Sequence, residues 1–138
     1  MQNEPRALRR VGWTSLLGWA CVGLALESAH GLKLASYLDD TLTRELCTLG
    51  HAHGVGLAIV TILVGEHGLK LLPAERVRAV ATATAIAAIA VPLAFVGSAL
   101  GHPEGDPGLV IWVVPIGALI LLGALAAIAW SAWRDDEA

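Results

Sequence analysis

The chain has 138 residues, a formal net charge of −3 at pH 7 and a mean hydropathy of +0.67. Hydrophobic residues make up 56% of it and charged residues only 15%, whereas about 25% of a typical soluble domain is charged. This composition excludes an ordinary soluble domain, and the mildly acidic balance argues against nucleic-acid binding. It is typical of a protein embedded in a lipid bilayer.

Four apolar segments are each long enough to cross a bilayer, which takes about 20 residues. They cover residues 12–35, 48–71, 77–100 and 109–133. Each must be a helix, because hydrocarbon offers no partner for backbone N–H and C=O groups. We therefore predict a single all-α domain, residues 1–138, with four transmembrane helices. The first is expected to be a retained span rather than a signal peptide, because it is long and no A-x-A cleavage site follows it.

The basic residues predict how these helices are oriented. Seven of the nine fall near the termini or in the turn between the second and third spans. These seven are Arg6, Arg9, Arg10, Lys70, Arg76, Arg78 and Arg134. Because positively charged loops stay in the cytoplasm, both termini are expected to be cytoplasmic, in a bacterial inner membrane. Trp13, Trp130 and Trp133 are then expected at the inner interface, and Trp112 at the outer one.

The connecting segments and the prolines predict local features. The segment ASYLDDTLTREL is expected to form an interfacial turn in which Asp39 or Asp40 caps the next helix. The segment GHPEGDPG is typical of an outer loop, in which His102 is expected to be solvated. Pro92 and Pro115 are expected to bend their helices, because each removes a backbone hydrogen bond. The small residues of the third span, AVATATAIAAIAV, favour close helix packing.

Ionisable residues within a membrane span are costly, so each calls for a partner or a function. Glu27 and His30 are three residues apart and therefore share a helix face. They either satisfy each other or a neighbouring helix, or they form a second polar site for protons or a ligand. Glu66 and His67 lie close to the inner end of their span, where they can reach headgroups or water.

Two histidines stand one residue apart in the stretch LGHAHGVGLAIV. At about 100° per residue, His51 and His53 are separated by roughly 200° and point to opposite sides of the helix. They cannot bind one metal ion together, which would need a spacing of four residues. Imidazole binds zinc, copper, iron and haem iron. Cys47, four residues before His51, adds only a second ligand, whereas a structural zinc site needs four.

The same stretch carries three glycines, Gly50, Gly54 and Gly56. They either serve helix packing or leave room beside the backbone for a flat macrocycle.

These residues resemble the His-x-His stretch in the catalytic subunit of haem–copper oxidases. In that family the two histidines ligate two haems on opposite sides of one helix, the second helix of a four-helix arc, and three such arcs make twelve helices. The chain also resembles small four-helix membrane proteins with a similar His-x-His. The resemblance implies a homotrimer of twelve helices, in which each haem b is ligated by His51 of one subunit and His53 of its neighbour.

Two departures from the oxidase pattern limit what the resemblance implies. The third span has no histidine, and the only tyrosine, Tyr37, lies in the outer segment, so neither the copper site nor the cross-linked tyrosine is carried over. Because bis-histidine haem has no open iron position, the expected role is electron transfer or redox sensing rather than oxygen reduction. Quinol or a periplasmic electron carrier is the expected donor.

Two other functions stay open. Copper or zinc could bind between His51, His53, Cys47 and His30, gathered from several helices. Alternatively, the chain is a structural or transport membrane protein without a cofactor, whose histidines bond to neighbouring helices.

Overall fold

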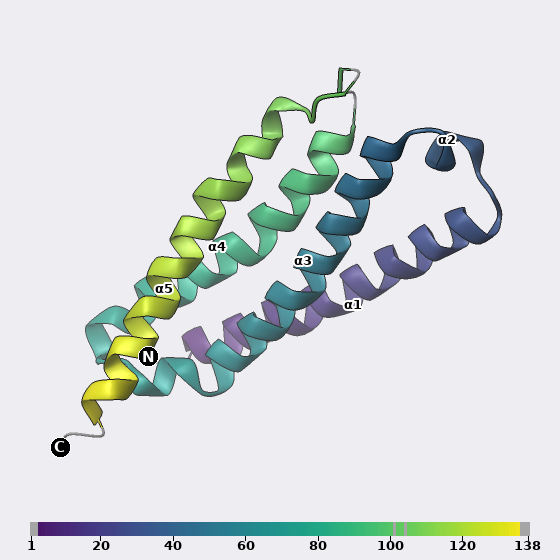
Figure 1. Ribbon diagram of the computed structural model, residues 1–138. Helices are drawn as coiled ribbons and strands as arrows, with labels where there is room; N and C mark the ends of the chain where they lie inside the picture. The colour runs from purple at the N-terminus through teal and green to yellow at the C-terminus, as the bar shows by residue number, and fades with distance from the viewer. Residues whose placement is uncertain (1–2, 101, 104, 136–138) are drawn as a thin grey trace.

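A computed structural model describes residues 3–100, 102–103 and 105–135. The described residues are mostly helical and contain no strand, which confirms the predicted all-α class (Figure 1). Its elements are α1 (Asn3–Gly31), α2 (Ala35–Leu38), α3 (Thr41–Glu66), η1 (Gly68–Leu71), α4 (Ala74–Ala99), η2 (Leu109–Trp112) and α5 (Val113–Asp135).

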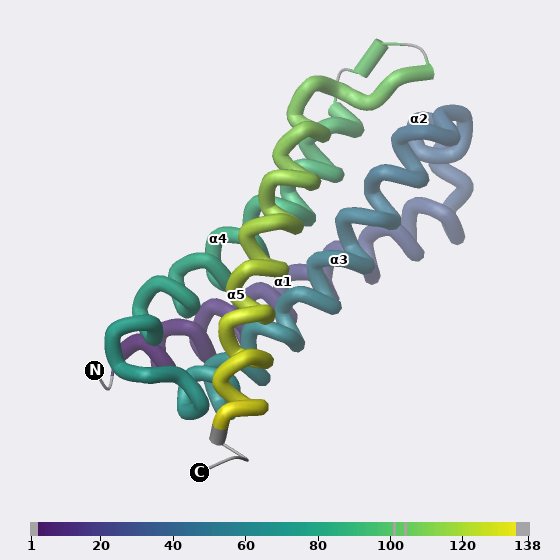
Figure 2. The backbone as a smooth tube through the Cα atoms, turned by 60° about the vertical axis from the view of Figure 1, so that its left-hand side comes forward, coloured from purple at the N-terminus to yellow at the C-terminus, as the bar shows by residue number. Residues whose placement is uncertain are grey.

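The four long helices run antiparallel in chain order. α1 packs on α3, α3 on α4 and α4 on α5, and α1 also contacts α4. The start of α1, the η1 turn and the end of α5 lie at one end of the bundle (Figures 1 and 2). We call this the terminal end, and the opposite end, with α2 and the α4–α5 loop, the loop end. The seven basic residues that were predicted to lie on one side of the membrane are therefore found at one end of the bundle, the terminal end.

Three segments are long and apolar enough to cross a membrane, namely Thr41–Glu66, Ala74–Ala99 and Leu109–Arg134. They correspond to the second, third and fourth predicted spans and support an integral membrane protein. α1 has 29 residues but does not belong to this group. Arginines near its start, and Glu27 and His30 near its end, make it less apolar, so the four-span topology stays a prediction.

α1 ends earlier than the predicted first span. The helix stops at Gly31, and Lys33 adopts a left-handed φ of 53°. The N–H of Leu34 donates to the carbonyl of Ala29 at 3.0 Å, and that of Lys33 to His30 at 3.1 Å. This is the Schellman pattern of helix termination, with lysine at the position that glycine usually takes.

α3 begins earlier than the predicted second span because Asp40 caps it. The carboxylate of Asp40 accepts a hydrogen bond from the backbone N–H of Thr43 at 3.0 Å. Of the two aspartates proposed as the cap, Asp40 rather than Asp39 takes this role. The predicted span ran on to residue 71, but α3 ends at Glu66 and the rest forms η1.

The two membrane prolines occupy different positions in their helices. Pro92 lies inside α4 and is fully buried, where its missing N–H removes an intrahelical bond. Pro115 lies in the first turn of α5, which begins at Val113. The N–H groups of a first turn have no intrahelical partner, so the reason for the predicted bend at Pro115 does not hold there.

α4 forms the centre of the packing. Half of its apolar stretch is buried inside the chain, against 28% for α3 and 11% for the segment Leu109–Arg134. Ala87, Ala88 and Ala94 are almost completely buried on it, and such small side chains let neighbouring backbones approach closely. The predicted role of the small residues in helix packing is therefore confirmed.

Three hydroxyl groups are also fully buried, those of Thr61, Thr84 and Ser98. Each donates to the carbonyl four residues earlier, at 2.6–2.8 Å. Their hydrogen bonds therefore close within their own helices, which removes the penalty of burying them.

Candidate functional site

His51 and His53 face different neighbours of α3. Nδ1 of His51 lies 2.9 Å from the backbone oxygen of Trp19 on α1. Nδ1 of His53 lies 2.8 Å from the backbone oxygen of Leu49, one turn earlier on α3, and its ring centroid is 4.8 Å from that of Phe95 on α4. One imidazole therefore faces α1 and the other lies on the α4 side, as expected for residues two apart on one helix.

These contacts determine which ring nitrogen of each histidine carries the proton. A carbonyl oxygen can only accept, so Nδ1 of His51 and of His53 must each carry a proton. In the neutral ring the lone pair then resides on Nε2. Neither Nε2 has a hydrogen-bond partner among the described residues. Metal-bound histidines are commonly oriented in this way, with the second N–H donated to a carbonyl or a carboxylate.

Two glycines shape the contact between α1 and α3. A Cβ atom at Gly23 would lie 2.4 Å from Cε1 and 2.9 Å from Nε2 of His51. A Cβ atom at Gly54 would lie 2.2 Å from the Trp19 ring. The imidazole of α3 thus occupies the space left by a glycine of α1, and the indole of α1 the space left by a glycine of α3.

The other two glycines beside the histidines differ from each other. A Cβ atom at Gly50 would lie 2.7 Å from Val96 on α4, whereas Gly56 has open space beside it. Gly50 and Gly54 therefore serve helix packing, and only Gly56 leaves room along the backbone.

An open cleft of about 780 Å³ lies beside His51 between α1 and α3, toward the loop end. Its lining residues are Gly23, Leu26, Glu27, His30, Tyr37, Arg44, Glu45, Thr48, Leu49 and His51. We call it the His51 cleft. Glu27 and His30, expected to form a separate polar site, line the same cleft as His51. Among the described residues, no hydrogen bond or ion pair joins these two side chains to each other.

Two helical stripes face each other across the His51 cleft. Arg44, Thr48 and His51 follow the i, i+4, i+7 spacing of one face of α3. Gly23, Glu27 and His30 follow the same spacing on α1. Sequence reasoning missed Arg44, although its position two turns before His51 could have indicated it.

Arg44 is held in place at the wall of the His51 cleft. Its guanidinium Nη1 donates to the backbone oxygen of Leu38 in α2. The cleft therefore carries a positive charge near the loop end, and its lining also includes the acidic residues Glu27 and Glu45.

Cys47 lies away from this arrangement. It is half-buried against an apolar cluster of Leu46, Val91, Phe95 and Ala99, and both its thiol and that of Cys21 are free. In the part of the chain that the structure describes, no three His, Cys, Asp or Glu side chains gather around a common point suited to a metal ion.

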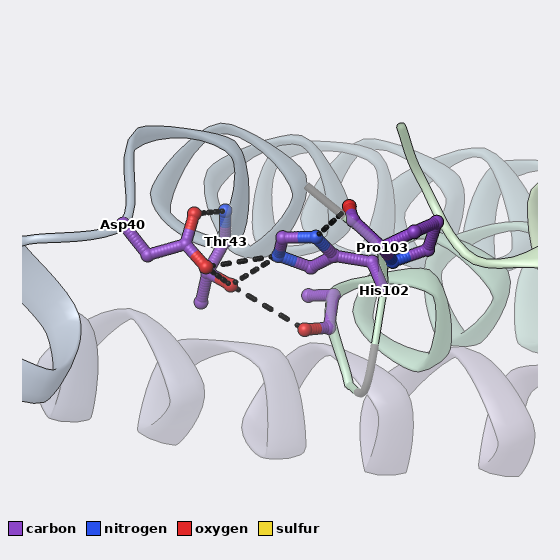
Figure 3. A network of polar contacts seen from close by, with 5 residues as sticks. Asp40, Thr43, His102 and Pro103 are labelled. Atoms are coloured by element: carbon purple, nitrogen blue, oxygen red, sulfur yellow. Dashed lines mark hydrogen bonds and ion pairs between the residues drawn. The ribbon is translucent and has the colours of Figure 1, made fainter. Parts of the chain in front are cut away.

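A second polar group ties the α4–α5 loop to the start of α3 (Figure 3). Nε2 of His102 lies 2.9 Å from Oδ2 of Asp40 and 3.1 Å from Oγ1 of Thr43, and its Nδ1 lies 2.9 Å from the backbone oxygen of Pro103. The His102 side chain is only 10% exposed. The expectation that it is solvated is therefore wrong, because the sequence alone does not reveal the nearby carboxylate of Asp40.

Both ring nitrogens of His102 face acceptors, so this contact favours the doubly protonated ring. The Pro103 carbonyl and then Asp40 raise the pKa of His102 above its ordinary value of 6.5. Hydrogen bonds from Thr43, backbone first, lower the pKa of Asp40 below 3.8.

Near the terminal end, Glu66 of α3 has a partner in the chain. Nη1 of Arg9 on α1 lies 3.0 and 3.1 Å from the two carboxylate oxygens of Glu66. His67 ends α3 and is exposed. The prediction that these residues reach headgroups or water is thus incomplete for Glu66, which bonds across to α1.

Comparison of the chain with protein-family models, with curated proteins and with solved structures finds no match.

Proposed function

We propose that this chain is an integral membrane protein that binds haem b and carries or senses electrons. In the proposed assembly, a homotrimer of twelve helices, His51 of one subunit and His53 of its neighbour ligate each haem. One observation carries the proposal. Two imidazoles on one helix face different sides, and each has Nδ1 held by a backbone carbonyl and Nε2 without a partner among the described residues.

The donor chemistry fits haem iron. Neutral imidazole nitrogen is an established axial ligand, and a second hydrogen bond from the ring fixes its orientation. Here the carbonyl of Trp19 orients His51, and that of Leu49 orients His53. A haem held by these residues would supply a one-electron couple, and ligation by two histidines would leave no open position on its iron.

Other residues of the His51 cleft have roles in this proposal. Gly23 lets the imidazole of His51 lie against α1. The Arg44 guanidinium offers a charge partner for a haem propionate, because guanidinium and carboxylate form strong charge-assisted hydrogen bonds. In this proposal Glu27 and His30, which line the same cleft, take up or release the protons that accompany electron transfer.

The direction of the two rings supports sharing of each haem between subunits. Ligands on opposite sides of α3 cannot reach one iron, so His51 and His53 would each ligate a separate haem, and in the proposed trimer the second ligand comes from the neighbouring subunit. Large apolar side chains stay exposed along the outer helices, among them Leu119 and Leu122 at 69% and 60%. Lipid and neighbouring subunits would cover these surfaces. We further propose that α1 is the fourth span, that both termini are cytoplasmic and that quinol or a periplasmic carrier donates the electrons.

Visible spectroscopy of the detergent-purified chain tests this function. We expect sharp α and β bands after reduction with dithionite, and their loss in His51→Ala and in His53→Ala. His67→Ala is the matched control, because this exposed histidine at the end of α3 should keep the bands.

Other outcomes would point to the alternatives. A colourless protein that contains stoichiometric copper or zinc would favour a metal site over haem. A protein without any cofactor, whose oligomer persists in the His51→Ala/His53→Ala variant, would favour a structural or transport role.

A further inference from the structure

A second cleft lies toward the terminal end of the bundle, far from His51 along α1 and α3. It has a volume of about 540 Å³ and is lined by Arg6, Arg9, Arg10, Trp13 and Thr14 of α1 and by Glu66 of α3. We call it the arginine cleft. Its residues of α1 follow a spacing of three and four, so that the first turns of the helix present one continuous basic face.

The arginine cleft carries excess positive charge. Glu66 neutralises Arg9, whose Nη1 contacts both of its carboxylate oxygens. No carboxylate among the described residues lies within ion-pair distance of Arg6 or Arg10, and both side chains are exposed. Two guanidinium groups therefore remain for an external anion. Guanidinium matches the geometry of phosphate oxygens and binds them through paired hydrogen bonds.

The basic face continues directly into an exposed apolar face on the same helix. Arg10, Leu17 and Leu24 are spaced by seven residues, and Trp13 lies between the first two. Trp13, Leu17 and Leu24 are 60%, 68% and 70% exposed. A ligand bound along this stripe meets charge at one end and hydrocarbon over the following turns, as a phospholipid requires. A free phosphate ion would make no contact with the apolar part of this stripe.

The position of the arginine cleft also suits a lipid headgroup. The end of α5, with Trp130 and Trp133 at 63% and 76% exposure, lies at the same end of the bundle (Figure 2). Exposed tryptophans and arginines at one level are typical of the boundary between headgroups and acyl chains. Basic pockets at this level on the cytoplasmic side of membrane proteins bind anionic headgroups.

We propose that the arginine cleft binds the phosphate of an anionic phospholipid, with the acyl chains along Trp13, Leu17 and Leu24. Arg6 and Arg10 contact the phosphate, while Arg9 stays bound to Glu66 and holds α1 against α3. This site is independent of the proposed haem function, because none of its residues lines the His51 cleft.

Thermal unfolding of the full chain in dodecylmaltoside tests this proposal, with three additives compared at equal concentration: dioleoyl phosphatidylglycerol, dioleoyl phosphatidylcholine and inorganic phosphate. We expect phosphatidylglycerol alone to raise the Tm. The variant Arg6→Gln/Arg10→Gln should lower the affinity for phosphatidylglycerol on the order of 30-fold, from the usual contribution of a basic residue to anionic-lipid binding. Both arginines are exposed, so the fold should persist.

The matched control is Arg76→Gln/Arg134→Gln, which removes two exposed charges at the same end but outside the arginine cleft. This control should keep the Tm increase. The proposal is overturned by an equal loss in the control, by an unchanged response in Arg6→Gln/Arg10→Gln, or by no response in the unmodified chain. An equal increase with inorganic phosphate would overturn it too, since the site would then bind free anions.

Discussion

α4 and α1 are long helices of similar length, 26 and 29 residues, but their surfaces differ. α4 buries small side chains, and its buried hydroxyls donate to its own carbonyls. α1 has only Leu8 and Gly12 fully buried, and it carries ionisable residues over both clefts. The difference teaches that α4 supplies most of the packing, whereas the ionisable side chains gather in the groove between α1 and α3.

The largest effect on stability is expected from overfilling α4. Ala87→Leu adds volume at a site with no exposed surface, and should lower the free energy of unfolding by about 1–3 kcal/mol. Ile86→Leu, at a neighbouring position that is 50% exposed, should change it by less than about 0.5 kcal/mol. Unfolding in mixed micelles measures the change in the free energy of unfolding for each variant. Equal changes in the two variants would show that α4 is not the centre of the packing.

A smaller effect on stability, with a larger one on the site, is expected at Gly23. A methyl group there collides with the His51 ring, and the gain in helix propensity partly offsets the strain. Gly23→Ala should therefore destabilise by about 1 kcal/mol and abolish any haem bands. Gly18→Ala is the matched control, because its Cβ atom meets open space on the same helix. Intact bands in Gly23→Ala would contradict this placement of His51.

The ion pair between α1 and α3 should contribute less. The Arg9 and Glu66 side chains are each 37% exposed, so we expect a coupling of about 0.2–1 kcal/mol that weakens with added salt. A double-mutant cycle of Arg9→Gln and Glu66→Gln measures it directly. A coupling that does not change between low and high salt would argue against this assignment.

The smallest effect is expected at the loop end, and it depends on pH. Because the pKa of His102 is raised in the folded state, its contribution to the stability of the fold is complete below pH 6.5. That contribution is lost as the pH rises through the folded-state pKa. Because the pKa of Asp40 is lowered in the folded state, its contribution to the stability of the fold is complete above pH 3.8. That contribution is lost as the pH falls through the folded-state pKa. The contact is therefore strongest between these two values.

Amide hydrogen exchange in the α4–α5 loop checks this dependence. Protection of the Gly108 N–H, which donates to Ser98 at 3.0 Å, should fall as the pH rises above 6.5 through the raised pKa of His102, after correction for intrinsic exchange. His102→Gln should remove that pH dependence. If both proteins lose protection equally, another group is responsible.

Local features were predictable from the sequence because they depend on neighbours within one helical turn. The all-α class, three of the long apolar helices and the Asp40 cap are of this kind. So is the divergence of His51 and His53, since the angle between two residues follows from the helix period. The errors at helix boundaries also have local causes, such as the left-handed Lys33 that ends α1.

Contacts between helices were not predictable in the same way. Three such contacts join residues that are distant in the sequence: His51 with Gly23, Glu66 with Arg9, and His102 with Asp40. A periodic sequence pattern shows which residues share one face of a helix. It does not show which face of a neighbouring helix packs against them.

The sequence by itself therefore determined the helices, their apolar character and the opposed directions of the two histidines, because helix geometry repeats along the chain. Only the tertiary structure decided that His51 shares a cleft with Glu27, His30 and Arg44, and that Trp19 fits against Gly54. The physical reason is that the packing of small and large side chains sets how helices cross, and this crossing selects the partners of each polar group.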